Sequence, residues 1–144
     1  MTRYAQGFYE QADGLSPAPR LRVAVGFGPG RVVGLTALVD TGSDVCAFPE
    51  EAFRGFALEK PPSYFLVRPF DGNPHAAPAY YPAVTAGDIR ERHIAAVLRP
   101  GIEPLVGRSF LNRCRLELDA ASGLVRIEAR DRAGIGEPSP RRVL

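Results

Sequence analysis

Short stretches in which apolar and polar residues alternate recur along this 144-residue chain, with turns rich in Gly and Pro between them. A period of two is typical of a β-strand that buries one face. These stretches and a few short apolar runs predict strands at residues 21–27, 33–39, 63–67, 80–86, 94–98, 116–119 and 125–128. Helix signals are confined to two short segments, residues 49–58 and 107–114. The chain is therefore expected to fold as an all-β domain.

The chain is expected to contain one domain. Apolar residues make up 45% of it and charged residues 24%, which is close to the globular average and enough for one core. We expect an irregular N-terminal arm at residues 1–19, the domain at residues 20–130 and a flexible C-terminal tail at residues 131–144. No apolar run reaches the ~18 residues of a membrane span, and no apolar leader is visible. A cytoplasmic location, away from membranes, is therefore expected.

Charge and the scarcity of metal-binding residues argue against several classes of function. The formal net charge of +2 is too small to favour nucleic acid or an anionic membrane as a partner. The two cysteines, Cys46 and Cys114, are too few for a disulfide scaffold or a four-cysteine zinc site. The two histidines, His75 and His93, lie far apart in sequence and outside metal-ligand motifs. We therefore expect no metal and no cofactor.

One segment carries the residue types of a catalytic site. Residues 38–43 read LVDTGS, so that Asp40 directly follows an apolar strand. An acid in that place is expected at the edge of the core, and Gly42 would let the backbone approach it closely. Thr41 offers a hydroxyl to a neighbouring strand. A second segment, residues 105–108, reads LVGR and leads into the second short helix.

These two segments together resemble the retropepsin-like aspartic proteases, the single-lobed branch of the pepsin superfamily. In that family an apolar strand runs into Asp-Thr/Ser-Gly, a flap hairpin follows, and two apolar residues and a glycine precede a short helix. The match spans about residues 21–129, with the flap at roughly residues 63–86. The continuation over residues 107–119 resembles bacterial members. The resemblance implies a closed β-barrel-like lobe with a flap hairpin and one short helix.

The resemblance also implies a role for each matched residue. Asp40 matches the catalytic aspartate, and Thr41 matches the hydroxyl residue that joins the two active-site loops across a dimer. Asp44 and Arg108 match a structural ion pair. The tip of the flap, residues 70–75, and both chain ends depart from the retroviral pattern. Active-site support is implied for Thr41, Gly42, Asp44, Gly107 and Arg108, and substrate contact is expected for Ser43, Phe70, Gly72 and Val106.

The chemistry of this family needs two carboxyl groups that hold one water molecule. One carboxylate takes a proton from the water, while the other carboxyl is protonated and polarises the scissile carbonyl, since two like charges this close share a proton. This chain has a single Asp-Thr-Gly and room for one lobe, so a symmetric homodimer would supply the partner's Asp40. The expected function is an aspartic endopeptidase that cleaves an extended peptide or protein, with an acidic pH optimum.

Other functions agree with parts of the sequence. A catalytically silent dimer of the same fold would bind an extended peptide by β-augmentation. A phosphoryl-transfer enzyme would use Asp40 as its nucleophile, but such enzymes usually need a second acid two positions on, where this chain has Gly42. An RNA-binding β-domain would need more positive charge and an aromatic strand motif. Asp40 is also compatible with a turn aspartate that has no catalytic role.

Overall fold

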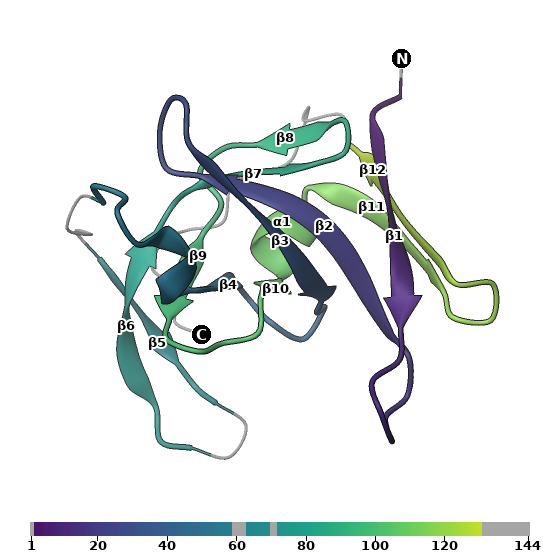
Figure 1. Cartoon of the computed structure of the whole chain (residues 1–144), viewed down its shortest axis with the longest axis horizontal. Coiled ribbons are helices and arrows are strands. Elements are labelled where there is room, and N and C mark those ends of the chain that lie inside the picture. Colours follow the sequence, from purple (N-terminus) through teal and green to yellow (C-terminus); the bar gives the residue numbers. More distant parts are fainter. Residues whose placement is uncertain (1, 59–62, 70–71, 131–144) are drawn as a thin grey trace.

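The computed structural model describes residues 2–58, 63–69 and 72–130 (Figure 1). These ranges contain twelve strands, one α-helix and one 3-10 helix, so the all-β prediction is confirmed. The strands are β1 (Tyr4–Glu10), β2 (Ala18–Gly26), β3 (Val32–Val39), β4 (Cys46–Pro49), β5 (Tyr64–Val67), β6 (His75–Tyr80), β7 (Ala83–Ala86), β8 (Ile89–Glu91), β9 (Ala96–Arg99), β10 (Leu105–Val106), β11 (Cys114–Asp119) and β12 (Leu124–Ala129). The helices are η1 (Glu50–Phe53) and α1 (Arg108–Leu111). Neither of these helices has the length and hydrophobicity needed to cross a bilayer.

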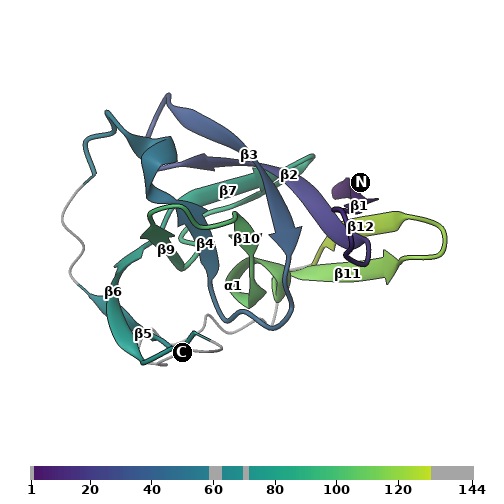
Figure 2. The ribbon, with the colours of Figure 1, turned by 60° about the horizontal axis from the view of Figure 1, so that its bottom comes forward.

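The strands form one hydrogen-bonded sheet with two free ends. The order is β11-β12-β1-β2-β3-β10-β4-β9-β6-β5, and the β7–β8 hairpin joins the side of β2. The end strands β11 and β5 lie on opposite sides of the molecule (Figures 1 and 2). The closed barrel implied by the resemblance is therefore corrected to an open lobe. It stays open because the two end hairpins, β11–β12 and β5–β6, diverge and do not pair with each other.

Strand β1 replaces the irregular arm that we predicted for residues 1–19. It pairs with both β12 and β2, and so connects the C-terminal hairpin to the rest of the sheet. Gly7 lies where a Cβ would overlap the carbonyl oxygen of Arg20, so the alternation of side chains is interrupted in this strand. The predicted tail, residues 131–144, lies outside the described residues, and the domain bounds stay a prediction.

The flap is the antiparallel hairpin of β5 and β6. Its returning strand ends at Tyr80, whereas residues 83–86 form β7, which pairs with β2 and β8. The single returning strand predicted at residues 80–86 is therefore wrong. Pro82 separates the two strands, because proline has no N–H to donate to a strand ladder.

Both predicted helices form, but they are shorter than expected. The segment at residues 49–58 contributes only η1, and Gly55 turns the chain away with a φ of 82°. The segment at residues 107–114 contributes α1, whose Phe110 and Leu111 are buried. Within the described ranges, the helical content is therefore two single turns, and α1 begins at the last residue of the second sequence motif.

Two hydrophobic clusters lie on opposite faces of β4. Cys46 and Phe48 are fully buried in the main core. Val45, which precedes the strand, and Ala47 belong to a smaller cluster that also contains Phe65 of the flap. Because successive side chains of a strand point to opposite faces, β4 separates the main core from the flap cluster. The flap is thus attached to the lobe by its own apolar contacts, close to the loop that carries Asp40.

Candidate active site

Asp40 lies where β3 ends, between buried Val39 and exposed Thr41. Its N–H donates to the carbonyl oxygen of Val106 at 3.0 Å, so the backbone here is attached to β10. Its carboxylate Oδ1 accepts the N–H of Gly42 at 2.9 Å. A Cβ on Gly42 would lie 3.2 Å from the same oxygen, which leaves little room for any other residue. The Asp40 carboxylate is therefore half-buried and held in one orientation by the main chain.

The two sequence motifs meet through the two-residue strand β10. Leu105 and Val106 pair in parallel with Leu38 and Val39 of β3, and Leu105 also pairs antiparallel with Ala47 of β4. β10 is therefore inserted between the strand that leads into the Asp40 loop and the strand that leaves it. The prediction that both motifs build one site agrees with this arrangement.

Gly107 lets this second segment approach the Asp40 loop closely. A Cβ at Gly107 would overlap the carbonyl oxygen of Val45 and would lie 2.7 Å from that of Ser43. Its φ of −101° is open to any residue, so the requirement for glycine is one of space and not of backbone angle. The next two N–H groups, of Arg108 and Ser109, donate to the carbonyl oxygens of Ser43 and Asp44 at 2.8 and 3.0 Å. The loop is thereby joined to the first turn of α1.

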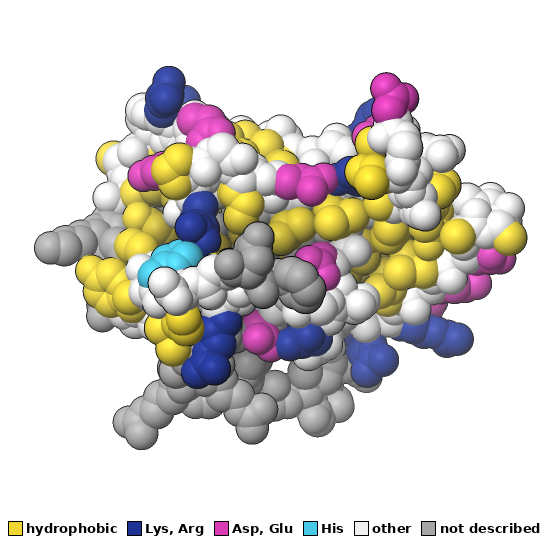
Figure 3. All heavy atoms as spheres, turned by 90° about the horizontal axis from the view of Figure 1, so that it is seen from below, with side chains coloured by type: hydrophobic (Ala, Val, Ile, Leu, Met, Phe, Trp, Pro, Cys, Tyr) yellow, Lys and Arg dark blue, Asp and Glu magenta, His cyan; other side chains and the backbone are white. Residues whose placement is uncertain are grey.

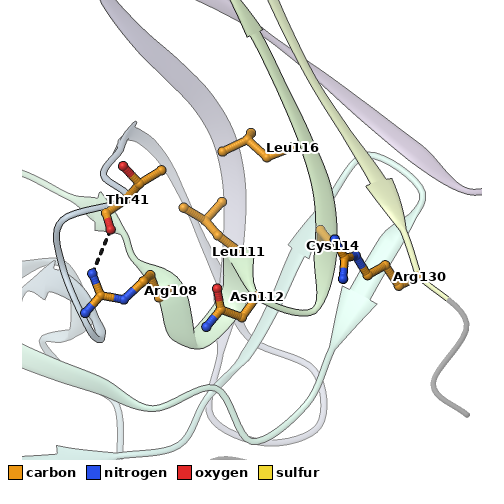
Figure 4. Close-up of a pocket in the computed structure, with 7 residues that line it drawn as sticks. All are labelled: Thr41, Arg108, Leu111, Asn112, Cys114, Leu116 and Arg130. Atoms are coloured by element: carbon orange, nitrogen blue, oxygen red, sulfur yellow. Dashed lines mark hydrogen bonds between the residues drawn. The ribbon is translucent and has the colours of Figure 1, made fainter. Parts of the chain in front are cut away.

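Arg108 connects α1 to both ends of the exposed part of the loop. Its guanidinium forms an ion pair with Asp44. It also donates from Nη1 to the carbonyl oxygen of Thr41 at 2.8 Å, the bond dashed in Figure 4. The side chains of Arg108 and Asp44 are 38% and 43% exposed, so the ion pair itself contributes at most about 1 kcal/mol to the free energy of unfolding. Its main effect is to fix the position of Thr41 and Asp44 relative to Asp40. The pairing expected for Asp44 and Arg108 is therefore present.

A surface hollow of about 560 Å³ opens beside Thr41. In Figure 4, Thr41 and Arg108 border one side of it, and Cys114 and Arg130 lie on the other. The residues that line the hollow are Thr41, Arg108, Leu111, Asn112, Cys114, Leu116 and Arg130. Thr41 is exposed, and its hydroxyl forms no hydrogen bond within the described part of the chain. The hollow therefore joins the active-site loop to the first half of β11.

The residues expected to contact substrate are placed differently from one another. Ser43 is half-buried, and its hydroxyl donates to the carbonyl oxygen of Val45 at 2.7 Å. Gly72 is exposed near the flap tip, and Phe70 lies outside the described residues. Val106 is 0% exposed within the main core, so the prediction that its side chain contacts substrate is wrong. Its backbone, which holds Asp40, is the part of Val106 that belongs to the site.

Ser109 supports the site and was missed in the sequence analysis. Its buried hydroxyl donates to the carbonyl oxygen of Ala95 at 2.8 Å and accepts the N–H of Cys46 at 3.2 Å. It thereby links α1 to β4 and to the residues that precede β9. In the sequence, the only sign of this role is a hydroxyl residue within an apolar helical segment. The partners of Ser109, Ala95 and Cys46, are remote in sequence and could not be identified.

The two cysteine thiols stay neutral near pH 7. Burial raises the pKa of Cys46, and burial together with the negative charge of Glu91 raises the pKa of Cys114 to about 12. A neutral, buried thiol is a poor nucleophile and a poor metal ligand. Within the described ranges, no group of three or more His, Cys, Asp or Glu side chains could hold a metal ion. The titratable group best placed for chemistry at this site is thus the Asp40 carboxylate.

Comparison with known proteins identifies a similar fold. No family profile and no curated protein matches the sequence. The fold is similar to that in the crystal structure of a retropepsin-like aspartic protease from Rickettsia conorii, with a TM-score of 0.60 and 16% sequence identity. The similarity covers 90% of this chain and 94% of that one. The retropepsin-like fold is therefore confirmed, while the place of this chain among bacterial members stays a prediction.

Proposed function

We propose that this protein is an aspartic endopeptidase. The observation that carries the proposal is the Asp40 loop, in which one half-buried carboxylate is oriented by the N–H of Gly42. The loop is held from behind by the backbone of Val106 and by the first turn of α1. A similar fold in a known aspartic protease supports this assignment. Catalysis by a preorganised carboxyl group requires this kind of fixed geometry.

The second carboxyl group would come from another copy of the chain. Asp44 is the other acid of the loop, and it is already paired with Arg108. We propose a twofold homodimer in which the Asp40 carboxyls of the two protomers lie side by side at the axis. The exposed Thr41 hydroxyls would meet near the same axis. Activity would then depend on protein concentration, because only the dimer contains the complete site.

In the proposed reaction, the two carboxyl groups hold a water molecule between them. The ionised carboxylate removes a proton from the water as its oxygen attacks the scissile carbonyl carbon, and the protonated carboxyl donates its proton to the carbonyl oxygen. Collapse of the tetrahedral intermediate breaks the C–N bond and passes a proton to the leaving amine. Both carboxyls return to the state in which they share one proton.

The substrate would be an extended peptide or protein segment bound between the loop and the flap. We propose that Ser43, which is half-buried, and Gly72, which is exposed, border that space, and that Phe70 has the same role. An extended backbone could add to the exposed edge of β5, which pairs only with β6 among the described residues. Neither a nucleic acid nor a membrane is needed for this reaction, and a cytoplasmic location remains part of the proposal.

The test is cleavage of a diverse peptide library by wild type and by Asp40→Asn, over a range from about pH 4 to pH 8. We expect cleavage by wild type alone, with more activity at acidic pH because the carboxyl pair must keep one proton. Binding of peptides without cleavage by either protein would favour the silent peptide-binding dimer. Cleavage by both proteins would remove Asp40 from its proposed role.

A further inference from the structure

The turn between β2 and β3, residues 27–31, contacts the chain on both sides of the flap. Phe27 of this turn is half-buried at the border of the main core. Its ring lies edge-on to the rings of Phe53, at the end of η1, and Tyr80, at the end of β6, with ring centres 5.2 and 5.8 Å away. Phe53 precedes the flap in the chain, and Tyr80 is the last residue of the flap. One side chain therefore touches both the segment that enters the flap and the strand that leaves it.

Arg31, at the other end of the same turn, contacts the entering segment a second time. Its guanidinium carbon lies 4.3 Å from the centre of the Phe56 ring, within the range of a cation–π interaction. Its Nη1 donates to the carbonyl oxygen of Gly55 at 3.3 Å. The ring of Phe56 is in turn 5.5 Å from that of Phe53. Four rings and one guanidinium thus form a continuous cluster, which we call the flap clamp: Phe27, Arg31, Phe53, Phe56 and Tyr80.

The two sides of the flap depend on this clamp to different degrees. The leaving side is also fixed by its backbone, since β6 pairs with β9 and the following strand β7 pairs with β2. The entering side, residues 54–58, belongs to no strand, and its backbone–backbone hydrogen bonds within the described ranges are local turns. The contacts of Phe27 and Arg31 are therefore what joins the entering side to the turn between β2 and β3.

The rest of the flap is attached to the lobe by few contacts. Among the described strands, β5 pairs only with β6, and β6 pairs with β9 through Ala79 and Tyr80. Phe65 packs into the flap cluster, whereas Tyr64 points to the opposite face of β5 and is 57% exposed. Figure 3 shows further hydrophobic side chains at the surface of the half of the molecule that carries the flap. The angle between the flap and the lobe therefore depends on how the base of the flap is held.

We propose that the flap clamp positions the flap for the reaction, with Phe27 as its central positioning residue. Because both ends of the flap are held on one turn, the clamp sets the direction in which β5 and β6 leave the lobe, and hence their distance from the Asp40 loop. A flap that is already in place loses less conformational freedom when it covers a peptide. The role in the reaction rests on the proposed function, whereas the clamp is a property of the fold and can be measured without substrate.

The first test compares amide hydrogen exchange in wild type and in Phe27→Leu, read by mass spectrometry on the full chain. Leucine keeps an apolar side chain but removes both edge-on ring contacts. Exchange in β5 and β6 should be about tenfold faster, because ring pairs of this kind stabilise by more than their burial alone. Exchange in β11 and β12, at the other end of the sheet, should stay within about twofold of wild type. Unchanged exchange in the flap, or an equal increase in all strands, would overturn the clamp.

Two further variants sharpen this test. Arg31→Gln keeps a donor for the carbonyl of Gly55 but loses the cation, so flap exchange should rise about threefold. Arg31 is exposed, so this variant tests the clamp even if Phe27→Leu folds poorly. Phe8→Leu is the matched control, because Phe8 is also half-buried and also lies beside an arginine, Arg22, but belongs to β1. It should change flap exchange by less than about twofold, and a response as large as that of Phe27→Leu would overturn the proposal.

Steady-state cleavage of a library peptide by the same proteins tests the role in the reaction. Phe27→Leu should raise KM about tenfold and change kcat by less than about threefold, because the Asp40 loop is untouched. Phe8→Leu should change neither constant by more than about twofold. Cleavage with an unchanged KM in Phe27→Leu would overturn the role in the reaction and leave the protease in place. A chain that responds in the exchange experiment but cleaves no peptide would support the clamp and count against the proposed protease.

Discussion

Two aspartates of this chain have the same local geometry but different surroundings. Asp40 follows β3 and accepts the N–H of Gly42 at 2.9 Å, while Asp119 ends β11 and accepts the N–H of Ala121 at 3.1 Å. Around Asp40, the backbone of a remote segment, residues 105–109, adds further hydrogen bonds. The bonds of Asp119 are confined to its own exposed turn. The comparison teaches that the turn orients an acid locally, whereas the remote segment builds a site around it.

Removal of the two carboxylates provides the strongest test of this difference. Asp40→Asn should lower kcat for peptide cleavage by roughly a thousandfold or more, because the amide cannot take a proton from water. Asp119→Asn, the matched control, keeps an acceptor for the turn and should leave kcat within about twofold. Steady-state kinetics with a cleaved peptide gives both values. Equal losses in the two variants would mean that Asp40 has no special role.

Two glycines near these aspartates are expected to resist substitution for different reasons. A side chain at Gly107 has no space, whereas a side chain at Gly123 would be strained by the positive φ. Gly107→Ala should lower the free energy of unfolding by about 3 kcal/mol or more, because its Cβ would overlap backbone atoms that cannot easily move. Gly123, in the Asp119 turn, has a φ of 73° and open space around it. Gly123→Ala should therefore cost only about 1 kcal/mol. Urea denaturation compares the two, and a smaller loss at Gly107 would contradict the close approach described here.

The Arg108 side chain should affect activity more than stability. Arg108→Lys keeps the positive charge but not the two-point contact with Asp44 and the carbonyl of Thr41, so kcat should fall about tenfold. The melting temperature should change little, because both side chains of the ion pair are well exposed. Arg90→Ala is the control, because Arg90 is exposed on β8 and its side chain forms no hydrogen bond or ion pair within the described ranges. A loss of stability as large as the loss of activity would assign Arg108 a purely structural role.

The last comparison contrasts the buried and exposed ends of β11, and its effect is confined to alkaline pH. Cys114 begins the strand with a pKa raised to about 12 by burial, while an unfolded chain has a thiol pKa near 9.0. The folded state thus favours the neutral thiol, and this contribution is complete below pH 9.0 and is lost as the pH rises toward about 12. The free energy of unfolding should fall between these pH values, and it should fall less in Cys114→Ala. An identical pH dependence of the two proteins would contradict this cause.

The sequence predicts local parts of this molecule better than remote ones. Asp40, Gly42 and Gly107 could be identified because each lies beside a strand or helix that has its own pattern. β10 could not, since a two-residue strand has no period and its partners are far away in the chain. The burial of Val106 and the bridging role of Ser109 depend on the same remote packing. β1 was missed because Gly7 hides the alternation on which strand prediction depends.

The separation of the two motifs also has a consequence for the newly made chain. Arg108 lies 67 positions after the carbonyl of Thr41 that it binds, so the Asp40 loop leaves the ribosome long before its support is synthesised. At ordinary rates of translation this delay is on the order of ten seconds. Contacts between such distant residues also form late in folding. An unfinished chain therefore holds an unsupported aspartate, and any proteolytic activity would begin only after synthesis has passed α1 and two finished chains have met.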